Sequence, residues 1–264
     1  MTGASIVKSP AGEVTRLIVS GGWSTEAAAH VAESHFDGLE FHGGEYANFR
    51  FLKPCAAKIT SLSILSGTWL SADGLEDLTS LRSLNIGPQL KGVDFSALTR
   101  LETLGLGAWT SGYAKTLFDC RFLKWLHIEG FGGTTCENIG RLKQLVGLSL
   151  ARGSLTSLAG LSGCAWLRAI QLAHLRKLND IVDIGALGAI REIELVENLP
   201  LIRDIRSVIG REEVRRLDLR GFDGQFDDIS WLRNMAHLNV LGLRNVVSLD
   251  WQSLFASRVL KKVA

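Results

Sequence analysis

A short apolar pattern recurs along the whole chain at intervals of 20–24 residues. It has the form Leu-x-x-Leu-x-Leu, with Val, Ile or Phe replacing some of the leucines, and it occurs eleven times. The copies begin at Val14, Phe36, Ile59, Leu81, Leu101, Leu123, Leu145, Leu167, Ile190, Val214 and Leu238. A repeat of this length is typical of a solenoid, in which short structural units stack on their neighbours.

Each copy of the pattern predicts one short β-strand. Counting from the first residue of the pattern, we expect the strand at positions 3 to 6. Because side chains alternate along a strand, positions 4 and 6 point inward and positions 3, 5 and 7 point outward. Stacked repeats then give about eleven parallel strands on the concave side of a right-handed α/β superhelix, with the inward Leu and Ile columns as its core.

The segment between two strands has a different period, with apolar residues every three positions. Before Leu167 these are Leu155, Leu158, Leu161 and Cys164. A step of three favours short 3₁₀ turns or extended segments over a long α-helix on the convex side. The Ala-rich segment Thr25–Ser34 is the exception. It predicts an α-helix whose N-cap is Ser24 or Thr25.

The repeats extend almost from end to end, so we expect a single solenoid domain over residues 1–264. Residues 14–247 form the eleven repeats, and residues 1–13 form an N-terminal cap. Residues 248–264 form a C-terminal cap, where Leu260-x-x-Val263 follows the eleventh pattern by 22 residues and predicts a truncated twelfth turn. Such caps protect the open end of a stacked core.

These features resemble the leucine-rich repeat family. The stretch from Leu178-Asn179-Asp180-Ile181 to Leu195 is similar to the short internalin-like class of bacteria, and the resemblance covers residues 14–263. It implies a protein-recognition scaffold that binds through its concave face and flanking loops. The chain departs from the family in one respect. The usual Asn, three residues after the last apolar strand position, occurs only at Asn198, so we expect less regular turns.

Charge and cysteine content restrict the class of partner and the compartment. The formal net charge is +2, from 29 basic and 27 acidic residues, which predicts neither nucleic-acid nor membrane binding. We see no signal peptide and no apolar run long enough to span a bilayer. Three of the four cysteines, Cys120, Cys136 and Cys164, occupy core columns, and no C-x-x-C pair occurs. Buried free thiols indicate a cytoplasmic protein.

The sequence contains no catalytic signature that we recognise. It lacks a P-loop, G-x-G-x-x-G, H-E-x-x-H and G-x-S-x-G, and its six histidines are scattered. We therefore expect no enzyme activity, no metal site and no cofactor. One alternative stays open, in which His127 and Glu129 serve a small-ligand binder or an enzyme.

The outward positions predict a binding surface on the concave face. An aromatic ridge around Trp125 and a charged ridge in the last repeats flank a floor of small residues in repeats seven and eight. Trp and Arg are the residue types most enriched at binding hot spots. The predicted partner-binding residues are Trp109, Trp125, His127, Glu129, Gln171, Glu192, Glu194, Arg216, Asp218, Arg220 and Arg244. Trp109 and Phe131 could alternatively fold inward and cover the edge of the core.

These observations predict a non-enzymatic protein-binding module that is monomeric outside its complex. Within that class we favour a cytoplasmic immunity protein that occludes a cognate bacterial toxin on the concave face. This narrower choice rests on the family resemblance. The alternative is a translocated effector or host-interaction protein, which would need an export route.

Overall fold

Each of the eleven apolar patterns forms one β-strand in the predicted register. The computed structural model describes residues 3–8, 15–33, 35–36, 38–197, 199–226, 228–245 and 262–263. The repeat strands are β2 (Thr15–Ser20), β3 (Gly38–His42), β5 (Ser61–Ile64), β7 (Ser83–Ile86), β8 (Thr103–Leu106), β9 (Trp125–Phe131), β10 (Gly147–Gly153), β11 (Ala169–Ala173), β12 (Glu192–Val196), β13 (Arg216–Asp218) and β14 (Val240–Gly242). All of them begin at position 3 of their repeat except β2, which begins one residue earlier.

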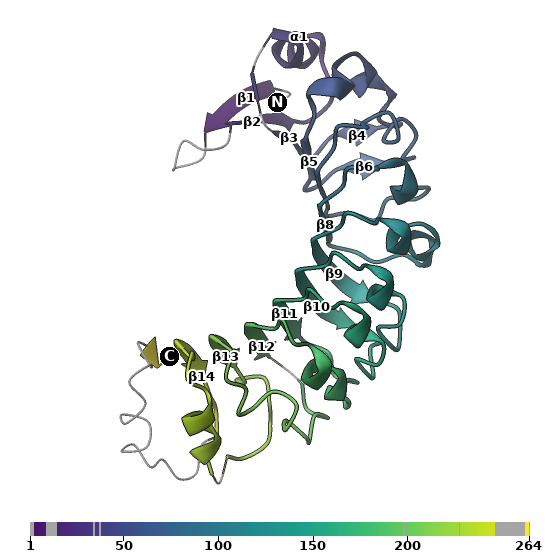
Figure 1. The fold of residues 1–264 in the computed structure, drawn as a ribbon. Helices are drawn as coiled ribbons and strands as arrows, with labels where there is room; N and C mark the ends of the chain where they lie inside the picture. Colours follow the sequence, from purple (N-terminus) through teal and green to yellow (C-terminus); the bar gives the residue numbers. More distant parts are fainter. Residues whose placement is uncertain are drawn as a thin grey trace. The chain divides into compact units, whose positions relative to one another are not determined.

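Contacts within the chain define two compact units, Met1–Ile128 and Glu129–Ala264. In the first unit β2, β3, β5, β7, β8 and β9 pair in parallel in that order. In the second unit β10 to β14 pair in parallel in chain order (Figure 1). Each pairing joins a repeat position to the same position of the next repeat, as Leu104 is joined to Leu126. The predicted parallel, one-strand-per-repeat architecture is confirmed, whereas the single domain over residues 1–264 stays a prediction.

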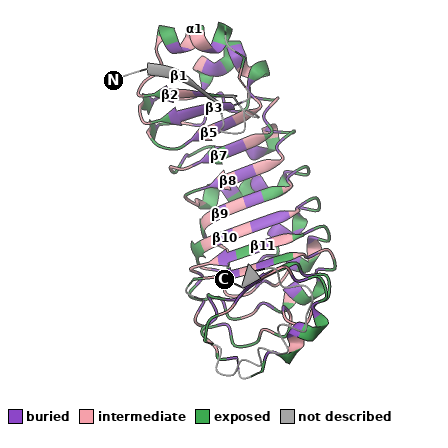
Figure 2. Cartoon of the chain, turned by 90° about the vertical axis from the view of Figure 1, so that its left-hand side faces the viewer, coloured by how far each residue is buried: buried purple, intermediate pink, exposed green. Residues whose placement is uncertain are grey.

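The core of each unit lies between its sheet and the returning segments. Leu104 and Leu106 of β8 are 1% and 0% exposed, while the alternating residues Thr103 and Gly105 are only half-buried. The same alternation marks β5, β7, β9, β11 and β12 (Figure 2). Each fully buried apolar side chain stabilises the fold by about 1.5–3 kcal/mol before the entropy cost is subtracted.

Short 3₁₀ helices occur in most of the returning segments, as the step of three predicts. They are η1 (Arg50–Lys58), η2 (Phe95–Ala97), η3 (Ser111–Lys115), η4 (Leu117–Asp119), η5 (Ile139–Arg141), η6 (Leu161–Gly163), η7 (Val182–Ala186) and η8 (Ser230–Asn234). The column Leu155, Leu158, Leu161 and Cys164 is fully buried. The corresponding column before β13 is less completely buried, since Ile205 is half-buried whereas Ile202 and Val208 are buried.

The one predicted α-helix is present as α1 (Thr25–Glu33). Its N-cap is Ser24, whose Oγ accepts a hydrogen bond from the Ala27 backbone N–H at 3.1 Å. This bond satisfies one of the free donors of the first helical turn. Ala27 and Val31 form the buried face of the helix.

Two strands outside the eleven repeats pair with the first and with the last repeat strand, β2 and β14. The strand β1 (Gly3–Lys8) pairs with β2 in antiparallel fashion, a direction that the repeat pattern does not predict. The strand β15 (Lys262–Val263) pairs with β14 and joins Leu241 to Val263, which is the register of the predicted twelfth turn. The rest of the predicted C-terminal cap lies outside the described residues.

Aromatic rings of neighbouring repeats stack on one another in the first unit. The strands β4 (Glu45–Tyr46) and β6 (Thr68–Trp69) form a separate two-stranded sheet. The Trp69 ring stacks on Tyr46 and on Phe49, with ring centroids 4.1 and 4.2 Å apart. The turn before β4 needs Gly44, where φ is +91° and a Cβ atom would lie 2.0 Å from the Gly21 carbonyl oxygen. The predicted asparagine position, Asn198, lies outside the described residues.

All four cysteines are free and buried, and three of them occupy the predicted core columns. Burial raises the pKa of Cys120 and of Cys136 to about 12. Burial likewise raises the pKa of Cys164 to about 11. The neutral thiols therefore behave as small apolar core side chains.

We predict that these thiols make the fold less stable at alkaline pH. Below pH 9.0, the ordinary pKa of an exposed thiol, the thiols are protonated in both states and add no pH dependence. Above that pH the unfolded thiols ionise while the folded ones stay protonated, so the free energy of unfolding falls as pH rises. The measurement is urea unfolding between about pH 8 and 11, a range set by the ordinary thiol pKa. Cys136→Ala is the control and should have a shallower fall; equal slopes for parent and variant contradict the assignment.

We predict a large contrast between inward and outward substitutions in neighbouring strands. Leu126 of β9 is 2% exposed, whereas Thr103 of β8 is half-buried on the opposite face of the sheet. Leu126→Asp buries an unpaired carboxylate and should cost several kcal/mol, about the upper range for one substitution. Thr103→Asp should cost far less. Thermal or urea unfolding measures both, and equal losses would contradict the assignment of the two faces.

Candidate functional site

The outward side chains of each unit form the candidate site. In the first unit Trp125 of β9 is 49% exposed, as its position predicts, and His127 is half-buried. Trp109 is also half-buried, and its ring contacts Tyr113 and Phe118 with centroids 6.0 and 6.3 Å apart. Trp109 therefore packs against the edge of the core, as one of the two alternatives for this residue predicts.

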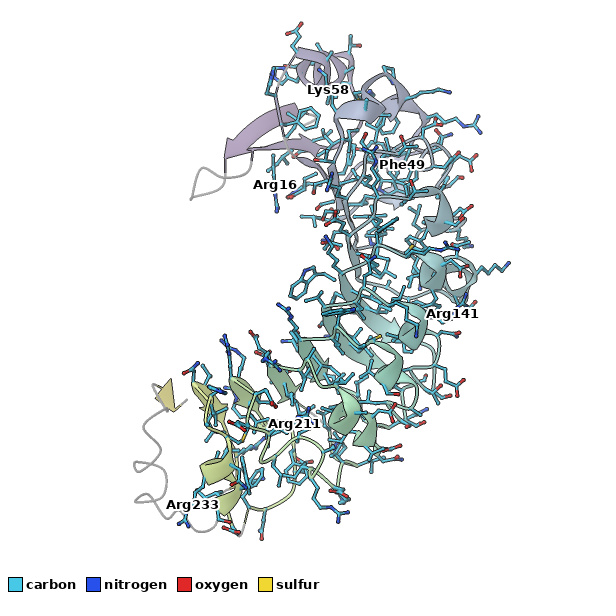
Figure 3. The ribbon with its side chains drawn as sticks, viewed as in Figure 1. Arg16, Phe49, Lys58, Arg141, Arg211 and Arg233 are labelled. Carbon is cyan, nitrogen blue, oxygen red and sulfur yellow. The ribbon has the colours of Figure 1, made fainter. Side chains whose placement is uncertain are left out.

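A second feature of the first unit was not predicted as a site. The Glu40 side chain of β3 is almost fully buried at an outward position, and the side chains of Arg16 and His42 contact its carboxylate. Arg16 Nη1 lies 3.0 Å from Glu40 Oε2, and His42 Nε2 lies 2.5 Å from Glu40 Oε1. Figure 3 labels Arg16, which projects from β2. The three residues occupy outward positions of adjacent repeats, so the repeat register already contains the signal for this cluster.

In the second unit a hydrogen-bonded chain of polar side chains runs across four strands. The Ser149 hydroxyl donates to Gln171 Oε1 at 3.0 Å, and Gln171 Nε2 donates to Glu194 Oε2 at 2.9 Å. Arg216 continues the chain, because its Nη1 lies 3.6 Å from Glu194 Oε1 and its Nε lies 3.8 Å from Glu192 Oε2. The strand register brings these side chains together, since Ser149, Gln171 and Glu194 face one another at position 5.

Asp218 and Arg220 of the predicted surface are also paired, in this case with each other. Arg220 Nε donates hydrogen bonds to both oxygens of the Asp218 carboxylate, each at 3.0 Å. This hydrogen bonding raises the pKa of Arg220. Asp218 is buried beside Gly242, where a Cβ atom would lie 2.8 Å from its carboxyl carbon. Arg244 is exposed and has no ion pair among the described residues. Apart from Arg244, the predicted arginines are already neutralised by carboxylates of their own chain.

Left-handed residues form a column at the ends of the strands where the chain leaves the sheet. Position 8 has a positive φ at Gly21, Gly43, Gly130, Arg152, His174, Glu197 and Asn245. Three of the non-glycine members, Arg152, His174 and Glu197, make polar side-chain contacts in the second unit. Arg152 Nη1 lies 2.9 Å from Glu129 Oε2, and His174 Nε2 lies 2.5 Å from Glu197 Oε2. This column was not predicted from the sequence, although the three glycines at equivalent positions were a usable signal.

The predicted surface is thus divided between the two units. Trp109, Trp125 and His127 belong to the first unit, and the other eight predicted residues belong to the second. The second unit brings Gln171, Glu192, Glu194 and Arg216 into one network. Asp218 and Arg220 form a separate pair, and Glu129 pairs with Arg152.

Neither a metal centre nor a membrane-spanning helix is found in the described part of the chain. No three His, Cys, Asp or Glu side chains within it lie together in a way that could hold a metal ion. No helix there is long and apolar enough to cross a membrane. The chemistry that the sites display is hydrogen bonding, ion pairing and aromatic contact.

Comparison with solved structures identifies the fold. An internalin (inlF) from Listeria monocytogenes is 20% identical, with a TM-score of 0.63 over 95% of this chain and 80% of the other. The leucine-rich repeat protein LIC12759 of Leptospira interrogans is 14% identical, with a TM-score of 0.52 over 92% of this chain and 74% of the other. TLR13, solved in complex with ssRNA13, is 16% identical, with a TM-score of 0.60 over 92% of this chain and 38% of the other.

No protein-family model and no curated protein sequence matches the chain. The structural matches, with eleven parallel repeat strands and short 3₁₀ turns, show that the chain has the leucine-rich repeat fold. The resemblance carried by the Leu-x-x-Leu-x-Leu pattern is confirmed at the level of the fold.

We predict that the ion pair of Asp218 contributes more to stability than its exposed counterpart. Asp204 and Arg206 repeat the same two-residue spacing, and Arg206 Nε donates to both Asp204 oxygens at 2.9 Å. Asp218→Asn should lower the free energy of unfolding by about 1–3 kcal/mol, because it weakens hydrogen bonds to a buried carboxylate. Asp204→Asn, on an exposed pair, should change it little. Urea unfolding of both variants tests this, and the reverse order would contradict it.

Proposed function

We propose that this chain is a non-enzymatic protein-recognition scaffold that binds its partner on the outward sheet face. The observation that carries the proposal is the Ser149–Gln171–Glu194–Arg216 chain of hydrogen bonds and ion pairs across four strands of the second unit. Side chains fixed in this way lose little conformational freedom when a partner binds. In the first unit, the exposed Trp125 supplies apolar area of the kind that anchors protein interfaces.

The internal ion pairs change how this face would recognise a partner. Glu129, Arg216 and Arg220 each have a partner in the chain, so they present neutralised, directional groups rather than free charges. Such a surface selects a partner by hydrogen-bond geometry and shape. Arg244 is exposed and has no ion pair among the described residues, so we expect it to pair with a carboxylate of the partner.

Within this class, we infer a cytoplasmic bacterial immunity protein that neutralises a cognate toxin. The four free buried cysteines support the compartment, because reduced thiols persist in a reducing cytoplasm. The bacterial internalin fold match supports the class of organism. The toxin as partner follows from family resemblance. The alternative, a translocated effector, would be favoured by a secretion chaperone gene next to this one.

The decisive experiment isolates the partner from the native cell by affinity capture and then tests its toxicity. A bacterial strain producing the captured partner should stop growing, and co-production of this chain should restore growth. A partner that binds but is harmless would refute the immunity role and leave the scaffold role standing. A partner that this chain chemically modifies, detected by mass spectrometry, would refute the non-enzymatic proposal.

We predict that Trp125→Ala weakens binding to the captured partner by about 2 kcal/mol, the usual size for a central aromatic anchor. The matched control is Leu70→Ala, since Leu70 is 74% exposed just after β6, outside the main sheet. Isothermal titration calorimetry measures both variants, and thermal unfolding verifies that both are folded. Parent-like binding by Trp125→Ala would show that the sheet face of the first unit is not the contact surface.

A further inference from the structure

Position 2 of the repeats, where each chain segment enters the sheet, forms a column of stacked side chains. In the first unit this column contains Arg82, Glu102 and Lys124, each one residue before the adjacent strands β7, β8 and β9. Glu102 N–H donates to the Arg82 carbonyl and Lys124 N–H donates to the Glu102 carbonyl, each at 2.8 Å. The side chains pair as well, because Glu102 lies 3.0 Å from Arg82 and 2.8 Å from Lys124. A carboxylate thus stands between two cations.

In the second unit the same column contains three arginines in succession, Arg168, Arg191 and Arg215. Their backbones are joined in the same way. Arg191 N–H donates to the Arg168 carbonyl at 2.8 Å, and Arg215 N–H donates to the Arg191 carbonyl at 2.7 Å. Arg168 and Arg215 are exposed and Arg191 is half-buried. Adjacent strands are about 4.8 Å apart, so the backbone positions of the three arginines form one short row.

Within the described part of the chain, no ion pair joins any of these three arginines to a carboxylate. Four other arginines of the second unit, Arg152, Arg206, Arg216 and Arg220, each have one. The Arg191 guanidinium donates instead to the backbone carbonyls of Gly188 and Ile190, which are neutral groups and do not compensate its charge.

A fourth arginine increases the positive charge near this row. Arg211, labelled in Figure 3, donates to the carbonyls of Gly185 and Leu187 at 2.9 and 2.8 Å. Burial lowers the pKa of Arg211, and the charge of Arg191 acts in the same direction, whereas Glu213 opposes them. Arg191 and Arg211 are therefore close enough for their charges to repel each other.

We propose that Arg168, Arg191 and Arg215 form a docking site for an acidic segment of a partner protein. The first unit shows the chemistry that such a site requires. There Glu102 supplies a carboxylate at this column, whereas the described residues of the second unit supply none at the same column. Partner carboxylates inserted along the row would form charge-assisted, bidentate pairs with the guanidinium groups. Trp166, which is 63% exposed and two residues before Arg168, offers an apolar contact beside the row.

An acidic protein segment fits this row better than a nucleic acid does. The row is short, since its neighbours at position 2 are Val146 and Asn239. The exposed residues Glu212 and Glu213 precede Arg215 and would repel a continuing phosphate backbone. A folded protein can present a few carboxylates without extending over these glutamates. The choice of a protein as occupant rests on the proposed function, although this edge is distinct from the outward sheet face.

The test uses a fluorescently labelled oligoglutamate peptide, with an oligoglutamine peptide and a single-stranded oligonucleotide of equal length for comparison. Fluorescence anisotropy at low salt should show binding of oligoglutamate alone. The signal should disappear near 1 M salt, where the Debye length is about 3 Å. Arg191→Glu should weaken binding roughly tenfold or more, because it recreates the alternating column of the first unit and repels the peptide.

Arg206→Glu is the matched control, since it makes the same charge change at an exposed arginine already paired with Asp204. It should bind oligoglutamate like the parent. Thermal unfolding should show Arg191→Glu as stable as the parent or more so, because repulsion in the row is relieved. Arg191→Gln adds no negative charge and should weaken binding less than Arg191→Glu.

Three results would overturn the proposal. They are absence of oligoglutamate binding at low salt, equal weakening by Arg191→Glu and Arg206→Glu, and tighter binding of the oligonucleotide than of oligoglutamate. The first two would remove the arginine site while leaving the sheet-face scaffold intact, because the effect of Trp125→Ala on the captured partner is measured independently. The third would indicate a nucleic-acid site and would count against a purely protein-binding function.

Discussion

The in-register pairing of parallel strands is the constraint on which the other features of the structure depend. Each pairing places a residue beside the residue at the same repeat position in the next strand, about 4.8 Å away. A repeat position is therefore a physical column, and its members must be compatible with one another along its length. Apolar columns satisfy this condition readily, because Leu84, Leu104 and Leu126 bury one another. No repeat could form such a core alone, so stability comes from neighbouring repeats.

Columns that are not apolar satisfy the constraint by other means. The Tyr46 and Trp69 column is held by ring stacking, and the turn beside it needs a glycine where the backbones approach closely. The position 5 column of the second unit is held by hydrogen bonds that link Ser149, Gln171 and Glu194. An asparagine column is thus one of several solutions to stacking the turns. Neighbouring rings and amides can satisfy the same geometry with different chemistry.

The column constraint explains which parts of the structure the sequence could predict. Strand positions, the buried step-three columns and the twelfth-turn pairing follow from apolar spacing, because burial acts on each residue according to its own position. The pairing of Arg216 and Arg220 with carboxylates depends on side-chain rotamers and on which neighbour, in the same segment or on the adjacent strand, each guanidinium reaches, and spacing does not specify these. The antiparallel direction of β1 was missed for a related reason: residues 1–13 contain no repeat from which a direction could be inferred. The outward position of Trp125 was predictable because its apolar neighbours fix the register.

Charged columns are the most demanding case, because like charges on adjacent strands repel. The chain solves this problem with an alternating column of Arg82, Glu102 and Lys124, in which hydrogen bonding to Lys124 and the nearby cations lower the pKa of Glu102. On the outward face of the second unit it uses Asp218 to hold Arg220. In contrast to these two solutions, the second unit has a row of three arginines that no described carboxylate pairs. In-register stacking sets like charges on neighbouring strands, so a partner that supplies carboxylates to this row would complete the column in the way that Glu102 completes it in the first unit.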